Sequence, residues 1–209
     1  MTTVVAGDGL PRCPWGVDPP EYRRYHDEEW GRPVVDDARI FEKLCLEGFQ
    51  SGLSWLTILR KREGFRNAFA RFDVATVAGF DDEDVARLLA DAAIVRHRGK
   101  IEATIANARA TLAVQAEEGA LAELVWRFEP EPRPPAESLA EIPATTHEST
   151  ALGKELRRRG FRFVGPTTVY SAMQSLGVVD DHLAGCHTRT AVEAARTALR
   201  RPGHGPPKG

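Results

Sequence analysis

Two cysteines and two histidines form a candidate metal-ligand set in this sequence. His182 and Cys186 are four residues apart in DDHLAGC, so on a helical turn they would face the same way, with Cβ atoms about 5 to 6 Å apart. Cys13 and His26 form a second, more loosely spaced pair near the N-terminus. Two thiolates and two imidazoles suit a closed structural zinc site. The alternative is that the histidines are ordinary partly buried residues and the cysteines are small apolar ones.

A carboxylate interrupts an apolar stretch in FEKLCLEGFQSGLSWL. Burying an unpaired charge costs several kcal/mol, so Glu47 needs a partner or a ligand. If one helix continued through the stretch, Glu47, Ser51 and Trp55 would share a face, and Tyr22 and Tyr25 could add aromatic walls. This combination favours a flat, cationic ligand that donates hydrogen bonds. The alternative is a core tryptophan and a carboxylate paired with an arginine.

The run GFRFVGPT, residues 160–167, has the glycine spacing of a phosphate-binding P-loop but a proline in place of the essential lysine. What remains is a helix that ends at Gly160, a turn through Gly165 and a second helix that begins at Pro166. The free amides of such a helix start can bind a phosphate. The run therefore predicts a helix-hairpin-helix turn.

Helical spacing of apolar residues recurs along the chain, whereas alternating strand patterns are weak. A helix is expected from the capping residues Asp36 and Asp37 to Gly48, and a Pro-rich surface connection at residues 129–138. Further helices are expected over residues 51–62, from 81–84 onward, over 100–117, and over ALGKELRRRG. The sequence predicts an all-α fold.

Composition and length restrict the class of protein. A chain of 209 residues with 42% hydrophobic and 28% charged residues is typical of one folded domain, and no apolar run approaches the roughly 20 residues of a membrane span. MTTVVAGDGLP does not resemble a secretory signal, which predicts a cytoplasmic location. Three cysteines argue against a disulfide framework. The net charge of -2 excludes global attraction to nucleic acid, so any DNA contact must be local.

Seven motifs, taken in order, resemble the 3-methyladenine DNA glycosylase I family of the helix-hairpin-helix glycosylase superfamily. They are RCPW, YHDEEWG, LCLEGFQSGLSW, LRKREGFRNAF, RHRGKI, GFRFVGPTTVYSAMQ and DDHLAGC. The resemblance covers residues 12–187. It implies a two-lobed helical domain with a helix-hairpin-helix DNA-binding element and a zinc site that joins the N- and C-terminal segments.

The resemblance implies a monofunctional DNA repair enzyme that flips 3-methyladenine out of alkylated double-stranded DNA and hydrolyses its N-glycosidic bond, leaving an abasic site. One structural Zn²⁺ and no nucleotide cofactor are implied, and we expect a monomer. The implied zinc ligands are Cys13, His26, His182 and Cys186. The implied base-recognising residues are Glu47, Trp55, Tyr22 and Tyr25, and the implied DNA-binding hairpin contains Gly165, Thr167 and Thr168.

Asp180 is a second catalytic candidate beside Glu47, because the wider superfamily has an aspartate at a comparable place. It could serve catalysis or only orient His182. Two alternatives stay open: a glycosylase for another lesion that uses Asp180, and a non-catalytic, zinc-bound DNA-binding module. We expect disorder over residues 1–10, a glycosylase domain over 11–187, and a partly helical or disordered extension over 188–209.

Overall fold

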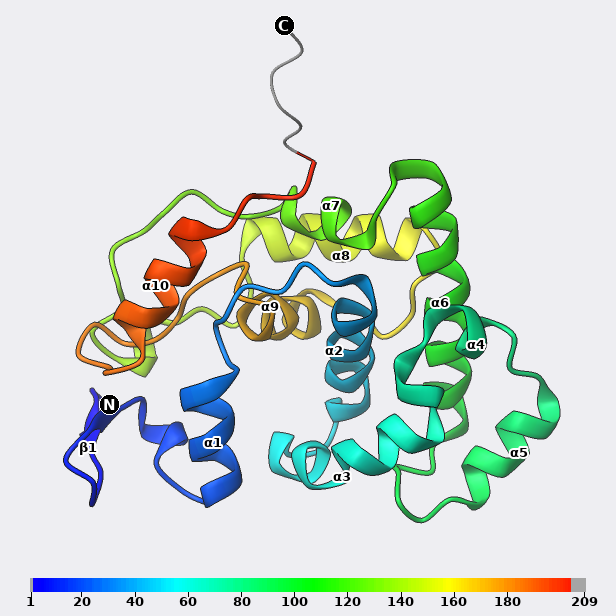
Figure 1. Cartoon of the computed structure of the whole chain (residues 1–209), viewed down its shortest axis with the longest axis horizontal. Helices are drawn as coiled ribbons and strands as arrows, with labels where there is room; N and C mark the ends of the chain where they lie inside the picture. Colours follow the sequence, from blue (N-terminus) through cyan, green and yellow to red (C-terminus); the bar gives the residue numbers. More distant parts are fainter. Residues whose placement is uncertain (1, 204–209) are drawn as a thin grey trace, which may run out of the picture.

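Helices provide almost all the regular structure of the computed structural model, which describes residues 2–203 (Figure 1). The α-helices are α1 Pro20–Glu28, α2 Asp37–Gln50, α3 Trp55–Ala68, α4 Val74–Ala78, α5 Asp82–Ala90, α6 Arg98–Glu118, α7 Leu121–Trp126, α8 His147–Arg158, α9 Pro166–Ser175 and α10 Arg189–Ala198. Short 3-10 helices cover Pro14–Gly16, Ala70–Phe72 and Leu139–Glu141. The predicted mostly helical fold is confirmed.

The helix boundaries follow from local capping. The Asp36 carboxylate accepts a hydrogen bond from the Arg39 amide at 2.9 Å and starts α2, as the sequence predicts. The side chain of Asp81 caps α5 in the same way. Gly160 follows α8 with a φ of 93°, and Pro166 is the first residue of α9. These boundaries agree with the sequence analysis.

The second predicted helix begins later than expected. α2 ends at Gln50, and Gly52 then adopts a φ of 80°, a left-handed conformation that an α-helix cannot contain. Ser54 caps α3 by accepting a hydrogen bond from the Thr57 amide, so α3 begins at Trp55. One helix does not continue through the stretch, so the condition under which Glu47, Ser51 and Trp55 would share a helix face is not met.

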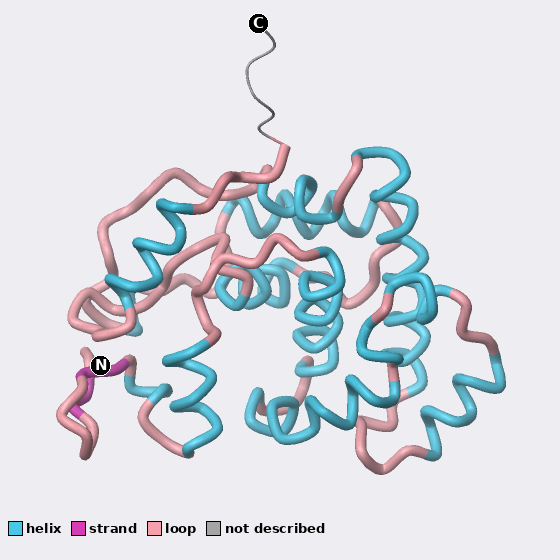
Figure 2. Tube along the Cα trace, viewed as in Figure 1, coloured by secondary structure: helices cyan, strands magenta, loops and turns pink. Residues whose placement is uncertain are grey.

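The N-terminal segment also differs from the expectation of disorder over residues 1–10. Val4–Val5 (β1) pairs antiparallel with Pro11–Arg12 (β2), and the Arg12 guanidinium holds the Asp8 carboxylate at 2.8 Å. Figure 2 shows this strand pair beside an otherwise helical chain. Residues 1 and 204–209, part of the tails named in the sequence analysis, lie outside the described residues.

Helix α2 lies at the centre of the molecule and packs against α3, α6 and α9 (Figure 1). Its buried residues, which include Phe41 and Phe49, join one core with aromatic side chains of α3 and the following turn, such as Phe65 and Phe69. α1 and α10 lie on the same side of the molecule, while α4 and α5 lie on the opposite side (Figure 1). None of the helices within residues 2–203 combines the length and hydropathy that a bilayer span requires.

Gly177, just after α9, packs closely against the backbone of the segment that follows α1. Its φ is 69°, and a Cβ atom there would lie 2.5 Å from the Arg32 carbonyl carbon and the Gly31 oxygen. We expect Gly177→Ala to lower the free energy of unfolding by roughly 2 to 3 kcal/mol, because backbone atoms cannot move aside cheaply. Urea unfolding measures this loss. Gly7→Ala, which adds a Cβ to open space, is the control; equal stability of the two variants would contradict the prediction.

Candidate active site and metal-ligand cluster

An aromatic cavity of about 340 Å³ opens between α1, α2, α3 and α9. The floor and walls combine indole and phenol rings with few polar groups, as in sites for flat ligands. The lining residues are Trp15, Tyr22, Tyr25, Trp30, Glu47, Gln50, Trp55, Leu139, Ile142, Ser171 and Gln174. All four residues that the sequence analysis names for base recognition line this one cavity. Ser51, in contrast, is exposed and does not line it.

The aromatic walls are fixed by contacts between helices. The Tyr25 and Trp55 rings lie 5.5 Å apart, and Trp15 packs edge-on against Trp30 at 4.9 Å. The Tyr22 hydroxyl accepts a hydrogen bond from the Leu56 amide at 3.0 Å, which attaches α1 to the first turn of α3. Trp55 Nε1 is buried and has no hydrogen-bond acceptor among residues 2–203. Its N–H is therefore a donor without a protein partner in the described chain.

Glu47 is 5% exposed and, within the described part of the chain, forms no ion pair within 4 Å. Burial raises the pKa of its carboxyl to about 8, although the Lys43 ammonium and the Ser175 hydroxyl act in the opposite direction. The expected alternative, a Glu47–arginine pair in the core, is not what the structure contains. A cationic ligand in the cavity would favour the ionised carboxylate.

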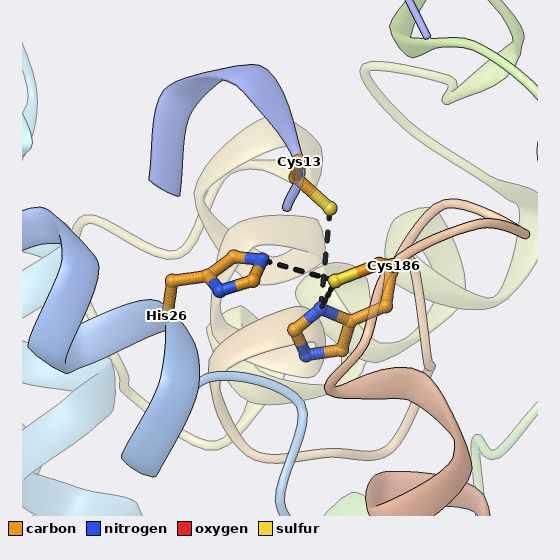
Figure 3. Close-up of side chains that lie close together, drawn as sticks. Cys13, His26 and Cys186 are labelled. Atoms are coloured by element: carbon orange, nitrogen blue, oxygen red, sulfur yellow. Dashed lines mark hydrogen bonds between the residues drawn. The ribbon is translucent and has the colours of Figure 1, made fainter. Parts of the chain in front are cut away.

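The four candidate metal ligands converge from distant parts of the chain. Figure 3 shows three of them, Cys13, His26 and Cys186, with their side chains close together. Cys13 precedes the first 3-10 helix, His26 belongs to α1, and His182 and Cys186 flank a turn before α10. All four are buried, and their ligand atoms lie within 4.8 Å of one another. The Cys186 sulfur is 3.5 Å from His26 Nε2 and 3.6 Å from His182 Nδ1, while the Cys13 sulfur is 3.9 Å from His182 Nδ1.

This geometry fits a tetrahedral zinc ion. Zinc bond lengths to sulfur and nitrogen place neighbouring ligand atoms roughly 3.3 to 3.8 Å apart. Hydrogen bonding between the thiols holds the pKa of Cys186 well below its usual value and that of Cys13 well above it. Two buried thiols that cannot both ionise alone are suited to a dication, which stabilises both thiolates. Cys45, by contrast, lies in the apolar core, as the sequence analysis expects.

Each histidine of the cluster is oriented by a hydrogen bond on its other ring nitrogen. His26 Nδ1 lies 2.7 Å from the Asp27 carboxylate, which the Arg12 guanidinium holds in place. His182 Nε2 lies 3.1 Å from the Trp30 carbonyl oxygen. Such acceptors fix the tautomer that presents the remaining nitrogen to a metal. These acceptors are not predicted from the sequence, although Asp27 and Trp30 belong to the same motif as His26.

Asp180 does not lie in the cavity with Glu47. Its Oδ1 accepts a hydrogen bond from the His182 backbone amide at 3.1 Å, and its Oδ2 lies 3.7 Å from Arg189. It lines a different cavity beside α10. The expected catalytic role is therefore not supported by its position, and it contacts the backbone of His182 rather than the imidazole.

The neighbouring Asp181 is the carboxylate of this pair that contacts a residue lining the Glu47 cavity. It is buried and accepts hydrogen bonds from the Tyr170 hydroxyl at 2.6 Å and from Gln174 Nε2 at 2.8 Å. Arg133, from the Pro-rich connection, also contacts it. Because Gln174 lines the cavity, Asp181 fixes part of the wall. Sequence reasoning missed it because nothing local distinguishes the two aspartates of VVDDH.

The predicted hairpin lies between α8 and α9, which pack against each other. Gly165 is the N-cap of α9. The first backbone hydrogen bond of this helix runs from the Val169 amide to the Gly165 oxygen at 2.9 Å. The amides of Thr167 and Thr168 precede this bond at the N-terminus of the helix. Thr167 is exposed and Thr168 is half-buried. The arrangement leaves a helix start at the surface, which favours an anion.

Comparison with known proteins agrees with this geometry. Residues 15–190 match the methyladenine glycosylase family. The chain is 49% identical over 180 residues to DNA-3-methyladenine glycosylase 1 of Escherichia coli strain K12, covering 85% of this chain and 96% of that protein. It is 43% identical over 183 residues to DNA-3-methyladenine glycosylase of Haemophilus influenzae, covering 86% and 98%.

A solved structure gives the same result. The structure that describes 3-methyladenine recognition by 3-methyladenine DNA glycosylase I from Staphylococcus aureus superposes with a TM-score of 0.81 at 35% identity, covering 85% of this chain and 96% of that one. The chain therefore belongs to the methyladenine glycosylase family of enzymes.

The burial of Glu47 makes stability depend on pH. Because its pKa is about 8 in the folded protein and near 4.5 when exposed, the folded state retains a proton that the unfolded state releases between these values. Stability should therefore fall as pH rises from 4.5 to 8. We expect Glu47→Gln to remove this fall. At pH 8.5 the free energy of unfolding of the variant should exceed that of the wild type by roughly 2 to 4 kcal/mol.

Urea unfolding of both proteins at pH 5, 7 and 8.5 measures the difference. A gain that is the same at all three pH values would show that Glu47 is not the group responsible.

Proposed function

We propose that this enzyme excises 3-methyladenine from alkylated double-stranded DNA by hydrolysing the N-glycosidic bond, leaving an abasic site. The observation that carries the proposal is Glu47, a buried carboxylate without a close cationic partner in the described chain, inside an aromatic cavity of about 340 Å³. That volume is of the size that ligand pockets for small flat molecules have. The names of the similar proteins from E. coli and H. influenzae support the same substrate.

The base must leave the duplex before it can enter the cavity, because a stacked base exposes only its edges. Trp55 and Tyr25 would stack on the flipped base, with Tyr22 beside them. A cationic ring between aromatic faces gains up to about 2 kcal/mol per favourable contact. The cavity is bounded by α1–α3 on one side and α9 on another, so we place the base between two helical lobes.

Glu47 would accept hydrogen bonds from the adenine edge and would favour the positive charge of the methylated base. A base that is already cationic departs as a neutral molecule, so no general acid is needed to protonate it. Stabilising the transition state then depends on the preorganised carboxylate and rings. Water would attack the oxocarbenium-like sugar. Within the described residues, Glu47 is the only carboxylate that lines the cavity.

The hairpin supports hydrolysis without strand cleavage. Bifunctional members of the wider superfamily have a lysine nucleophile just after the hairpin, and this chain has Thr167 and Thr168 there. We assign the segment through Gly165 to a helix-hairpin-helix element whose helix-start amides bind a DNA phosphate. The enzyme would act as a monomer, with a catalytic domain over residues 11–187 and an extension over 188–209.

We also propose that Cys13, His26, His182 and Cys186 hold one structural zinc ion. As a Lewis acid it would keep both cysteines as thiolates and supply no step of the reaction. Its ligands adjoin the cavity wall: His26 follows Tyr25 directly, and the Trp30 carbonyl accepts from His182. The site would therefore fix the aromatic wall as well as the chain ends.

The proposed activity predicts a large loss when the carboxylate is replaced. Wild-type protein incubated with methylated duplex DNA should release free 3-methyladenine, which chromatography identifies. We expect Glu47→Gln to reduce excision roughly 10²- to 10³-fold while remaining folded, because the transition state loses its charged acceptor. Asp180→Asn should retain most of the activity, since Asp180 lies outside the cavity.

A folded wild-type preparation that releases no 3-methyladenine would refute the proposed function. Binding of an abasic-site duplex with strong salt dependence, but without base release, would instead indicate a non-catalytic DNA-binding module.

The zinc proposal predicts about one zinc ion per chain by elemental analysis, since structural sites normally stay filled. We expect Cys186→Ser to lower the zinc content and the Tm, and a strong chelator to lower the Tm of the wild type. Cys45→Ser, which changes a cysteine outside the cluster, should retain zinc. Less than about half a zinc ion per wild-type chain would contradict the assignment.

A further inference from the structure

A buried lysine lies one helical turn before Glu47 on α2. Lys43 is 5% exposed, and its position four residues before Glu47 places the two side chains on the same helix face. Its Nζ lies 5.6 Å from the centre of the Tyr25 ring, which lines the cavity. The lysine itself does not line the cavity. Lys43 therefore lies next to the cavity-lining residues Glu47 and Tyr25 without lining the cavity itself.

Glu29 fixes the lysine and joins three helices. Its Oε1 accepts a hydrogen bond from Lys43 Nζ at 2.7 Å, and its Oε2 accepts one from Arg62 Nη1 at 2.7 Å. Glu29 follows α1, Lys43 belongs to α2 and Arg62 belongs to α3. These are the helices that carry Tyr25, Glu47 and Trp55. The ion pairs consequently connect the three helices that carry these cavity-lining residues.

The Glu29 carboxylate does not by itself balance the two cations that it contacts. Lys43 and Arg62 carry two positive charges, and Glu29 carries one negative charge. Lys43 is the first of the groups that lower the pKa of Glu47 against the effect of burial. Burial also lowers the pKa of Lys43, and Glu29 opposes this and favours the ammonium form.

The other helices that face Glu47 contribute no further charge among the described residues. From α1, Tyr22 and Tyr25 face the cavity, and the pKa of Tyr25 lies well above its usual value because of burial. From α9, the facing groups are the neutral side chains of Ser171, Gln174 and Ser175. Arg62 on α3 is engaged by Glu29. Lys43 is thus the charge that acts most directly on Glu47.

Lys43 does not form an ion pair with Glu47, because its ammonium group is bonded to Glu29. A direct Lys43–Glu47 ion pair would occupy the carboxylate oxygens and compete with a cationic base. No such pair within 4 Å occurs in residues 2–203, and the ammonium instead contacts Glu29. The carboxylate consequently keeps its oxygens free while a nearby positive charge reduces the cost of ionising it.

We propose that Lys43, held by Glu29, is a positioning residue that sets the ionisation of Glu47 and thereby the pH range in which the enzyme recognises a cationic base. This inference rests on the proposed excision of 3-methyladenine. Lys43 acts through Glu47 and does not touch the substrate. It lowers the cost of ionising the carboxyl when a cationic base binds.

The test is the pH dependence of kcat/KM for base release, measured from pH 5.5 to 9.5. In the wild type, kcat/KM should rise with pH as Glu47 ionises. Lys43→Met should move this rise upward by about one pH unit, which gives roughly tenfold lower kcat/KM at pH 7 and less than twofold at pH 9.5. Lys43→Arg keeps the charge and should restore the wild-type profile. Lys61→Met, which removes a lysine bonded to the Ala92 carbonyl at the surface, should leave the rise in place.

A second readout does not require activity. The stability difference between Glu47→Gln and wild type grows with pH while the folded carboxyl keeps a proton that the unfolded one has released, and it levels off once the folded carboxyl ionises. In a Lys43→Met background this growth should continue to higher pH. If wild-type protein releases base but Lys43→Met shifts neither curve, the inference on Lys43 is wrong. If no protein releases base, the proposed function fails, and the unfolding curves still decide whether Lys43 controls Glu47.

Discussion

Glu47 is removed from water without a close counterion in the described chain, and an arrangement of this kind costs several kcal/mol unless the surroundings offset it. The surroundings do so only in part, since the pKa of the carboxyl remains near 8. A protein that tolerates this cost has an incompletely satisfied acceptor in a preformed aromatic cavity. A flat cation that donates hydrogen bonds would reduce this cost. The energetic cost of burying Glu47 and the proposed selectivity for a charged base therefore have one origin.

Two sets of contacts outside the cavity keep its walls in place. On one side, the Cys/His cluster adjoins Tyr25 through His26 and Trp30 through its carbonyl oxygen. On the other side, Glu29 links α2 to α3 through Lys43 and Arg62. Both sets connect segments that are distant in sequence. The cavity walls are therefore held by polar contacts between distant segments, while the apolar core, which is rich in phenylalanine, supplies the bulk of the packing.

Local sequence signals predicted the local structure well, because capping aspartates, Pro166 and Gly160 act within one helical turn. They were less reliable at the end of α2. The left-handed conformation of Gly52 stops the helix at Gln50, so Ser51 does not lie on the helix face that carries Glu47. The types of the cluster residues were readable from the sequence, but their convergence is a property of the fold. Lys43 was not identified, since a lysine among several charged residues of α2 does not reveal that a glutamate from another segment contacts it.

The cavity draws its walls from opposite ends of the polypeptide. During synthesis, α1, α2 and α3 leave the ribosome long before α9, which contributes Ser171 and Gln174 to the cavity. They also precede the turn that contains His182 and Cys186. During synthesis Glu47 is therefore hydrated and negatively charged, and its desolvation is delayed until the last quarter of the chain arrives. Final assembly should accordingly be accompanied by proton uptake at neutral pH, so that completion of the fold and neutralisation of this carboxylate are a single thermodynamic event.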